Sequence, residues 1–452
     1  MKAYRLFPLI LLTVVTFNAA AYEAGIAKVV ITPQDKIWMA GYAARNHPAE
    51  GVEHDLYAKA LTLKDDEGSM VTMVTIDLLG VTSEMTQAIS TQVEEKTGMP
   101  ASNLMLTSSH THSGPVVRKN LNDMYDLSDE QKTLIASYTD TLIKNIIQAV
   151  LQSQQNLQPV SLSYGTGEAT FAINRREYTL QGVRIGLNPI APVDHDVPVL
   201  SIQNSDGKVI GMVFGYACHN TTMDFYQYCG DYAGFAQLEL ERLYPDATAM
   251  FWSGCGGDAN PNPRRELDHA KSHGRELAVA VASVLNAPMK NLDGSLQVNS
   301  STIDLQLTPA PSREEIEQQR ESSNKYIQSR ARNLLQTLVS KGSISETYPY
   351  PIQVWKIGEL TWVALAGEVV VDYALRFKHE YGRETTWVIA YANDVFAYIP
   401  SLRVLREGGY ESETSMIYYG LHGPWAETVE QSIVDEVDQL VSEINSKPSQ
   451  KQ

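Results

Sequence analysis

The sequence predicts an α/β protein with one large mixed β-sheet, helices on the faces of the sheet, and an active site at strand ends. Short apolar runs typical of buried strands alternate with longer segments of helical period. Some strands also pair locally, because turn signals such as Asn204-Ser-Asp-Gly207 separate them. Local pairing makes the sheet mixed rather than parallel. No repeat and no Gly/Ser/Pro linker divides the 452 residues, so one large domain is expected.

The expected elements run along the whole chain. Strands are predicted where apolar residues form short runs or alternate with polar ones: 71–77, 104–107, 158–171, 197–203, 209–218, 247–252 and 387–391. A hairpin over 351–366 turns at Gly358-Glu359. Helices are predicted by their period over 84–96, 129–152, 232–244, 266–285, 312–340, 368–380 and 426–444. The helix over 312–340 is polar and is expected to be mostly solvated.

The N-terminal segment has the features of a secretory signal peptide over residues 1–21. A basic start with Lys2 and Arg5 precedes an apolar run over 6–15, and Ala20 and Ala21 offer a cleavage point. The apolar run is too short to span a membrane. We therefore expect an exported protein, periplasmic or secreted, with one domain over 22–445 and a disordered polar tail over 446–452.

Composition limits the classes of partner. Apolar residues make up 43% of the chain and charged residues 20%, as in globular proteins, and the net charge is −17. This acidic balance argues against nucleic acid and against electrostatic docking on anionic lipid. The three cysteines, Cys218, Cys229 and Cys255, leave at least one thiol unpaired, and a Cys218–Cys229 bridge stays open. No feature indicates an obligate protein partner.

Two histidines follow the predicted strand over 104–107. His110 and His112 are spaced i, i+2, before Gly114 and Pro115 end the run. Side chains two apart on a strand point the same way, so both imidazoles are expected to lie together at the strand end. One can bind a metal while the other carries protons. The alternative is a pair of polar histidines without a metal.

Other predicted strands also deliver reactive side chains at their ends. His219 follows the strand over 209–218, and Glu368 follows the strand that closes the hairpin. Taken alone, His219 is better explained as a histidine bonded to the backbone. Taken alone, Glu368 is better explained as a charge at the start of a helix. Together with His110 they form a set that zinc accepts, and a water activated by that zinc can attack a carbonyl.

The order and spacing of these pieces resembles the neutral/alkaline non-lysosomal ceramidase family over about residues 25–425. The most specific part is Ser109-His-Thr-His-Ser-Gly-Pro115. The looser collinear parts are Ala24-Gly-Ile-Ala27, Met39-Ala-Gly-Tyr42, Ala172-Ile-Asn-Arg175, Cys218-His-Asn-Thr-Thr-Met223, Gly257-Asp-Ala-Asn-Pro-Asn262, Gly367-Glu368, and Tyr398 with Tyr410-Glu411.

The resemblance implies a zinc amidase with one zinc ion. It assigns the metal to His110, His219, Glu368 and Tyr398. It makes His112 the general acid/base that carries the proton to the leaving amine. It makes Arg175 and Tyr410 donors to the oxyanion of the tetrahedral intermediate. Tyr418 and Tyr419 compete with the two tyrosine assignments, and Arg176 competes with Arg175.

Two departures from the family pattern concern the substrate. In the loop with Gly257 and Asp258, Asn260 stands where the family has serine, so a nucleophilic serine is excluded at this position. The chain also ends soon after the matching region, so the C-terminal immunoglobulin-like domain of the full ceramidases is expected to be absent.

The sequence therefore predicts an exported zinc-dependent amidohydrolase of the N-acylsphingosine amidohydrolase type. It would cleave the N-acyl bond of ceramide or a related N-acyl lipid through a metal-activated water, and peripheral membrane contact is compatible with that substrate. The alternatives are an amidase for a different N-acyl substrate and a catalytically silent metal- or ligand-binding protein. A two-metal phosphoesterase would need bridging carboxylates, for which Asp77, Asp224, Asp231 and Asp258 are available.

Overall fold

The computed structural model describes residues 22–121 and 123–446. The predicted signal peptide and the predicted tail beyond Ser446 lie outside the described residues. The largest sheet has nine strands: β1 (Tyr22–Val30), β3 (Tyr57–Asp65), β4 (Met70–Ile76), β5 (Leu104–Ser108), β6 (Gln158–Glu168), β9 (Asp196–Asn204), β10 (Val209–Tyr216), β12 (Thr248–Ser253) and β14 (Lys290–Leu292).

The strand order is β12-β10-β9-β6-β1-β3-β4-β5, with β14 added beside β6. The pairs β10–β12 and β4–β5 are parallel, and the others are antiparallel. The predicted mixed sheet is therefore confirmed.

A second sheet covers one face of the first. It has the order β15-β16-β17-β19, formed by β15 (Leu296–Gln306), β16 (Thr347–Ile357), β17 (Leu360–Leu365) and β19 (Thr386–Ile389). Trp355, Trp362 and Trp387 stack on one another and pack with Met105 and Trp252 of the large sheet. This apolar layer between two sheets was not predicted.

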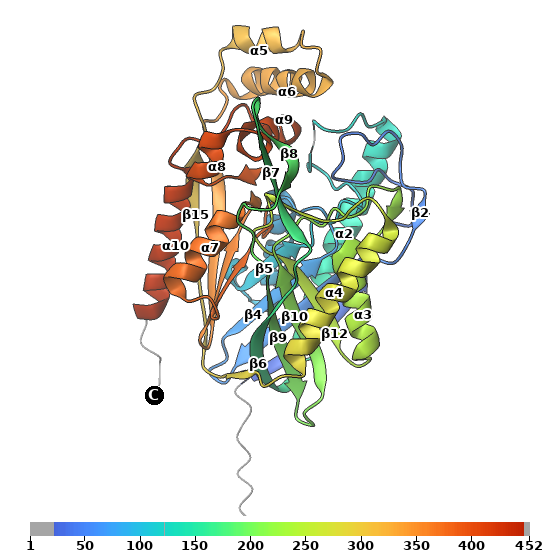
Figure 1. Ribbon diagram of the computed structural model, residues 1–452, viewed down its shortest axis with the longest axis vertical. Coiled ribbons are helices and arrows are strands. Elements are labelled where there is room, and N and C mark those ends of the chain that lie inside the picture. Colours follow the sequence, from blue (N-terminus) through green and yellow to red (C-terminus); the bar gives the residue numbers. More distant parts are fainter. Residues whose placement is uncertain (1–21, 122, 447–452) are drawn as a thin grey trace, which may run out of the picture.

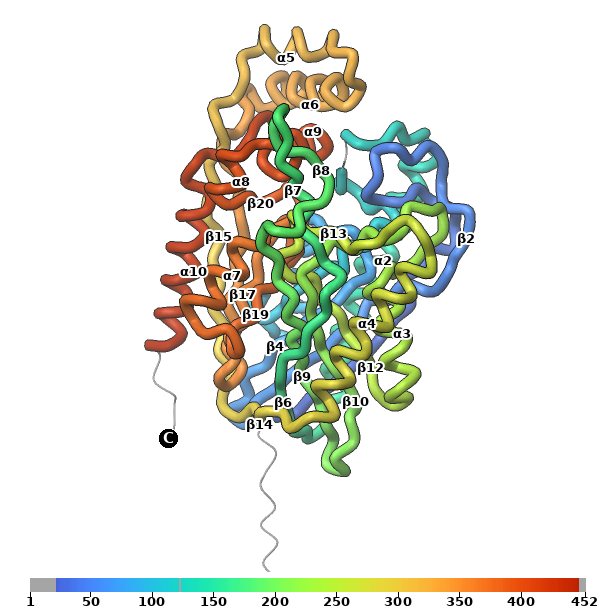
Figure 2. Tube along the Cα trace, viewed as in Figure 1, coloured from blue at the N-terminus to red at the C-terminus, as the bar shows by residue number. Residues whose placement is uncertain are grey.

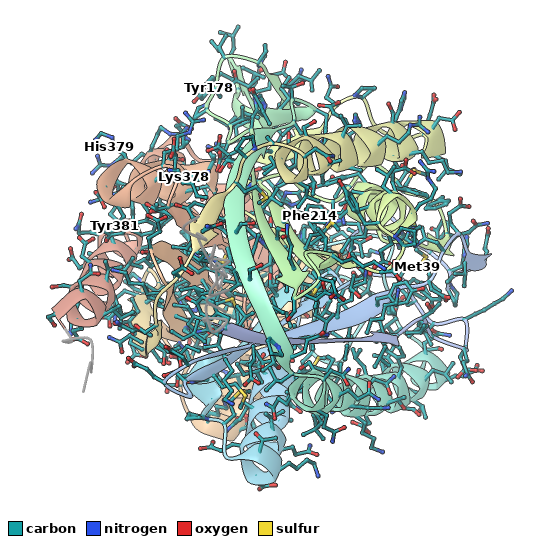
Figure 3. All side chains as sticks on the ribbon, turned by 90° about the horizontal axis from the view of Figure 1, so that it is seen from below. Met39, Tyr178, Phe214, Lys378, His379 and Tyr381 are labelled. Carbon is teal, nitrogen blue, oxygen red and sulfur yellow. The ribbon has the colours of Figure 1, made fainter. Side chains whose placement is uncertain are left out.

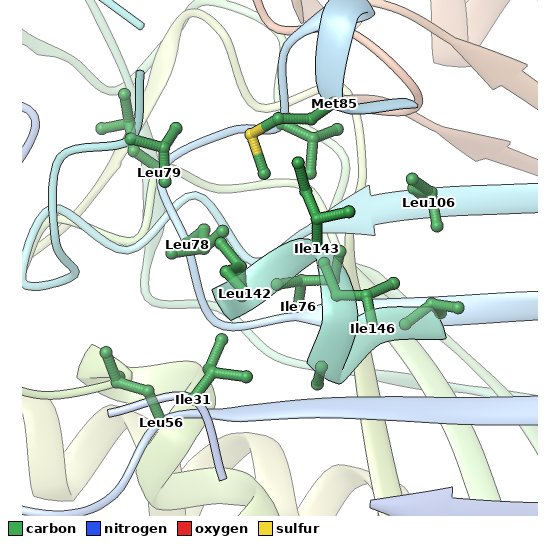
Figure 4. Close-up of a cluster of buried hydrophobic side chains, with 14 of the residues drawn as sticks. Ile31, Leu56, Ile76, Leu78, Leu79, Met85, Leu106, Leu142, Ile143 and Ile146 are labelled. Carbon is green, nitrogen blue, oxygen red and sulfur yellow. The ribbon is translucent and has the colours of Figure 1, made fainter. Parts of the chain in front are cut away.

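Helices cover the outer faces (Figures 1 and 2). The large sheet carries α1 (Ser83–Thr97) and α2 (Asp129–Gln155) over one part, and α3 (Asp231–Leu243) and α4 (Leu267–Leu285) over the other. The second sheet carries α7 (Val371–Tyr381) and α10 (Val429–Ser446). Figure 4 shows Leu142, Ile143 and Ile146 of α2 packed near Ile76 and Leu106 of the sheet. The strand period places alternate residues toward the helices and toward the second sheet.

Short elements complete the fold, most of them at the end of the molecule that holds the site. They are β2 (Gly51–Val52), a 3₁₀ turn (Ala101–Asn103), β7 (Ala172–Thr179), β8 (Gly182–Asn188), β11 (Gln227–Tyr228), β13 (Ala259–Pro261), β18 (Glu368–Val369), β20 (Tyr398–Ile399), α8 (Leu402–Glu407), a π-helical turn (Tyr410–Thr414) and α9 (Met416–Tyr419). Three small sheets form: β11-β2, β13-β7-β8 and β18-β20.

Two sequence expectations were wrong in detail. The single helix over 312–340 is two helices, α5 (Arg313–Gln319) and α6 (Lys325–Lys341), because Asn324 caps a new helix with its side chain. Glu368 does not start a helix: it forms β18, and α7 begins three residues later. Among the helices of the described ranges, none has the length and apolar character that crossing a membrane requires.

The two edge strands of the large sheet approach each other at the site. β5 and β12 stand at opposite ends of the strand order, yet they are in contact, and Ser253 Oγ donates to the carbonyl O of Ser109 at 3.0 Å. Isolated bridges Thr107–Ala392 and Gly254–Ile389 join both edges to the last residue of β19 and the segment that follows it. The sheet is therefore curled, and this curl brings together strand ends that are distant in sequence.

Candidate active site

His110 lies two residues beyond β5 and is almost fully buried. Its φ is +57°, a conformation that non-glycine residues adopt rarely, so the chain turns sharply at the strand end. Its Nδ1 lies 2.7 Å from the carbonyl O of Leu79 and must donate to it. The Nε2 atom therefore faces the interior of the site, and the neutral ring carries its lone pair there, which is the form in which histidine binds a metal.

His219 is held in the same way after β10. Its Nδ1 lies 2.7 Å from the carbonyl O of Gly256, in the loop after β12, and donates to it. Its ring stacks parallel to that of Tyr398, with centroids 6.0 Å apart. The Nε2 atom again carries the lone pair. Two imidazoles, each held at Nδ1 by a backbone carbonyl, thus face the same point from two strands.

Glu368 and Tyr398 reach this point from a pair of two-residue strands. They are directly opposite each other in the parallel pair β18–β20. Glu368 Oε2 lies 3.0 Å from His110 Nε2 and 2.9 Å from His219 Nε2, and Tyr398 Oη lies 3.0 Å from His219 Nε2. Gly367 permits this approach, because its φ is +77° and a Cβ atom would lie 2.7 Å from the carbonyl O of Ala397.

The contacts of 2.9–3.0 Å among these donor atoms suit the ligands of one small cation. Ligand atoms around a tetrahedral zinc stand about 3.3 Å apart when the bonds are about 2 Å long, and the donor separations here are close to that value. His110, His112 and His219 also form a group whose ring nitrogens lie within 4.8 Å of one another, the only group of three or more His, Cys, Asp or Glu residues found in the described ranges. A buried site able to hold a metal is therefore present, and its geometry does not identify the metal.

His112 differs from the other two histidines. Its Nε2 lies 3.1 Å from His110 Nε2, but its Nδ1 is buried and has no hydrogen-bond partner among the described residues. Gly41 packs against this ring: its φ is +97°, and a Cβ atom there would lie 2.3 Å from Nδ1. Since no carbonyl fixes its tautomer, His112 is better suited to carrying a proton than to permanent ligation.

Electrostatics set the protonation states that a metal requires. Burial, assisted by Arg175, lowers the pKa of His219 to about 4. Burial and the two neighbouring imidazoles also hold the pKa of His112 well below its usual value. Burial opposes ionisation of Glu368, but His110 and His219 outweigh it and hold the pKa of that carboxyl well below its usual range. At neutral pH the site therefore presents an anionic carboxylate and neutral imidazoles at His112 and His219.

Arg175 joins the donor cluster to the loop of Asn260. Arg175 is a residue of β7. Its Nη2 donates to Tyr398 Oη at 3.0 Å and its Nη1 donates to Asn260 Oδ1 at 3.3 Å. Its Nε donates to Glu411 Oε1 at 2.7 Å. Arg176, the competing candidate, points elsewhere and donates to Glu411 Oε2 at 2.6 Å. The buried Glu411 carboxylate thus orients Arg175 toward the site.

The remaining predicted site residues lie around this centre. Tyr410 lies in the π-helical turn, and the centroid of its ring is 5.4 Å from the centroid of the Tyr398 ring. Asp258 is fully buried, and its two oxygens accept from Val371 N at 2.9 Å and Asn174 Nδ2 at 3.0 Å. Burial raises its pKa to about 6. Gly257 N donates to the carbonyl O of Val369. Gly257 and Asp258 thus hold the loop against β18 and the residues that follow it. Contact between this loop and the substrate stays a prediction.

The structure adds Tyr419 to the site, in a role that the sequence does not predict. Tyr419 Oη donates to Glu368 Oε1, so this carboxylate presents only Oε2 to the two histidines. Nothing in the sequence distinguishes Tyr419 from Tyr418, because the four-residue helix α9 alone decides which ring faces Glu368.

Replacing Tyr419 by Phe is expected to weaken zinc binding by about 10- to 100-fold, the usual cost of losing a group that orients a ligand. Competition with a chromophoric chelator measures this. Tyr418→Phe is the matched control, because that ring packs against Tyr326 instead. Equal zinc affinity of Tyr419→Phe and the unaltered protein would show that Glu368 needs no such support.

The two-metal alternative finds no support in the described ranges. The four carboxylates it would use are dispersed: Asp77 accepts from Tyr57 N, Asp231 from Met223 N and Asp258 from Val371 N, while Asp224 pairs with Arg265. The three cysteines are all described, buried and free, so the Cys218–Cys229 bridge does not form.

Comparisons with known proteins agree with the resemblance seen in the sequence. A family model described as neutral/alkaline non-lysosomal ceramidase, N-terminal, matches residues 22–264. The neutral ceramidase of Pseudomonas aeruginosa is 27% identical over 214 residues, covering 45% of this chain and 30% of that protein. Neutral ceramidase A of Dictyostelium discoideum is 24% identical over 271 residues, covering 54% of this chain and 36% of that protein. The matched part is thus about a third of the length of these relatives.

Solved structures show the same fold. The crystal structure of neutral ceramidase from Pseudomonas aeruginosa has a TM-score of 0.72 at 19% identity, covering 95% of this chain and 75% of that one. A structure described as a ceramidase complexed with C2 has a TM-score of 0.74 at 18% identity, covering 96% of this chain and 77% of that one. The curled sheet and the layers around it are therefore a known architecture.

Proposed function

Because this chain belongs to the neutral/alkaline non-lysosomal ceramidase family, we propose that it is an exported zinc-dependent amidohydrolase that cleaves the N-acyl bond of ceramide or a related N-acyl lipid. The observation that carries the proposal is the convergence of His110, His219, Glu368 and Tyr398 on one point, with His112 and Arg175 beside it. Export rests on the leader predicted over residues 1–21.

Each residue has a distinct part in the proposed reaction. Zinc held by His110, His219, Glu368 and Tyr398 would supply Lewis-acid activation of water and of the amide carbonyl. The weakly basic, neutral imidazole of His112 accepts a proton at Nε2 and returns it to the leaving amine. Arg175 uses three of its five N–H groups on Glu411, Asn260 and Tyr398. The others can donate to the oxygen that becomes negative, and Tyr410 is the second donor.

Asn260 is compatible with this scheme. An amide side chain cannot act as a nucleophile. In the structure its Oδ1 accepts from Arg175 Nη1 at 3.3 Å, which is a positioning contact. The proposed role of Asn260 is thus to hold the Arg175 guanidinium beside the metal ligands.

A different N-acyl substrate is the second candidate. It is favoured by Asn260, by the low identity to the relatives, and by the fact that the match spans only about a third of their length. The chemistry of the site would be unchanged, and only the groups on either side of the amide would differ.

The test is fatty-acid release from N-acylsphingosine by the purified protein, with and without a zinc chelator. Release that the chelator abolishes and added zinc restores is the expected result. Release from other N-acyl amides but not from N-acylsphingosine would select the second candidate. Zinc-loaded protein that releases acid from no amide in a broad panel would overturn the proposal.

A further inference from the structure

The hairpin that carries Arg175 exposes an unusual number of apolar side chains. Twelve large hydrophobic side chains are markedly exposed in the described ranges, and five of them fall within residues 178–190. They are Tyr178, Leu180, Ile185, Leu187 and Ile190, with 55%, 101%, 50%, 54% and 92% of their surface exposed. We call these five residues the apolar hairpin surface. Figure 3 labels Tyr178 near the top of the view, at the outer end of β7.

The strand pattern of β8 is that of a covered face, yet Ile185 and Leu187 are 50% and 54% exposed, and only Val183 is half-buried, against Gly409. Val183, Ile185 and Leu187 alternate with polar residues or glycine, which normally marks the buried side of a strand. β8 is also the edge of the sheet β13-β7-β8, so its outer edge has no neighbouring strand. An apolar face in this position is typical of an interaction surface.

The charge of this segment selects the kind of partner. Residues 178–190 contain one charged residue, Arg184, in a chain of net charge −17. Its guanidinium pairs with Glu177, so the surface has no free charge to offer. An anionic or cationic macromolecule would find nothing to bind there. An uncharged apolar phase fits, and tyrosine beside aliphatic side chains is the composition that membrane interfaces favour.

The same strand connects this surface to the site. Arg175 is buried among the metal-binding side chains, and Leu180 stands five residues further along the chain, about 17 Å away in an extended strand. That distance is similar to the depth of one hydrocarbon leaflet, about 15 Å. A lipid drawn partly out of a bilayer beside the hairpin could therefore reach Arg175 while its chains stay shielded from water.

We propose that the apolar hairpin surface inserts into the zwitterionic surface of a lipid bilayer and so presents membrane-embedded N-acyl lipid to the site. This inference rests on the proposed function, because that function places the substrate in a membrane. It assigns the hairpin two roles, with one end holding Arg175 in the site and the other end holding the protein on the lipid.

The experiment is flotation of the mature protein, recovered after export, with phosphatidylcholine vesicles containing N-acylsphingosine. The test variant is Leu180→Asn with Ile190→Asn, because both side chains are fully exposed and their loss leaves no cavity. The matched control is Val279→Asn on α4, whose side chain is 61% exposed and lies outside the hairpin. Circular dichroism confirms that both variants fold.

The bound fraction is expected to fall at least about tenfold in the double variant and to stay unchanged in the control, because two large apolar side chains no longer leave water on binding. In the double variant, the rate of hydrolysis on vesicles should also fall relative to the rate of hydrolysis of a water-soluble short-acyl amide. Equal flotation of all three proteins overturns the proposal. So does flotation that requires anionic lipid.

A concentration-dependent dimer that only the double variant lacks would assign the surface to a second copy instead, and sedimentation velocity detects it. Flotation needs no turnover, so it tests membrane binding by the hairpin separately from the proposed hydrolysis. Hairpin-dependent flotation without hydrolysis contradicts the proposed function and leaves the docking surface standing. Hydrolysis without hairpin-dependent flotation supports the proposed function and contradicts the docking surface.

Discussion

Replacing His110 by alanine is expected to remove the metal and the activity together. His110 Nε2 is one of two imidazole donors at the site, and its tautomer is fixed by the carbonyl of Leu79. Its loss leaves Glu368 Oε2 facing one histidine instead of two. The several kcal/mol of stabilisation that a Lewis acid supplies would be lost, which corresponds to at least about a thousandfold in rate.

The measurement pairs the metal content of the purified variant with its rate of acid release. His379→Ala is the matched control, because His379 is an exposed histidine near the end of α7 (Figure 3) and should change neither quantity. A His110→Ala protein that retains one zinc per chain and full activity would show that the metal sits elsewhere.

Replacing His112 by alanine is expected to leave the metal in place and to lower turnover by about 10²- to 10⁴-fold, the usual contribution of a positioned proton carrier. The reason is geometric. His112 Nε2 lies 3.1 Å from His110 Nε2, but no carbonyl holds its Nδ1, unlike those of His110 and His219. It can therefore change protonation state without disturbing the other donors.

Added imidazole provides a second readout. The substitution leaves a space beside Gly41 that a small base can enter, so imidazole should restore part of the rate in His112→Ala and none in His110→Ala. Loss of zinc from His112→Ala would instead make His112 a third imidazole ligand, in line with the close grouping of the three ring nitrogens. A normal rate would remove its role in proton transfer.

The sequence located the strand ends that carry the donors, but not their convergence. Apolar runs predicted β5 and β10, so His110 and His219 were expected at strand ends, where the structure has them. Their meeting depends on the curl of the large sheet, which brings β5 and β12 into contact, and no local pattern encodes that curl. The layer of stacked tryptophans between the two sheets is equally non-local.

Other parts of the site are invisible to local patterns for a different reason. Tyr398 was assigned through the family resemblance alone, since tyrosine is an unusual ligand and β20 has only two residues. Tyr419 contacts Glu368 from a four-residue helix, and Glu411 contacts Arg175 and Arg176 from a π-helical turn, and neither contact follows from a local pattern. The hairpin β7–β8 was not predicted as a pair of strands, although the alternation in β8 of apolar residues with polar residues or glycine is present in the sequence.

The most direct test of the central claim is a zinc titration of metal-stripped protein that follows binding and N-acyl hydrolysis in the same sample. We expect both to saturate at one zinc per chain, and we expect His110→Ala to abolish both. Hydrolysis that persists without metal, binding of two ions before activity appears, or one bound zinc with no hydrolysis of any N-acyl amide would contradict it.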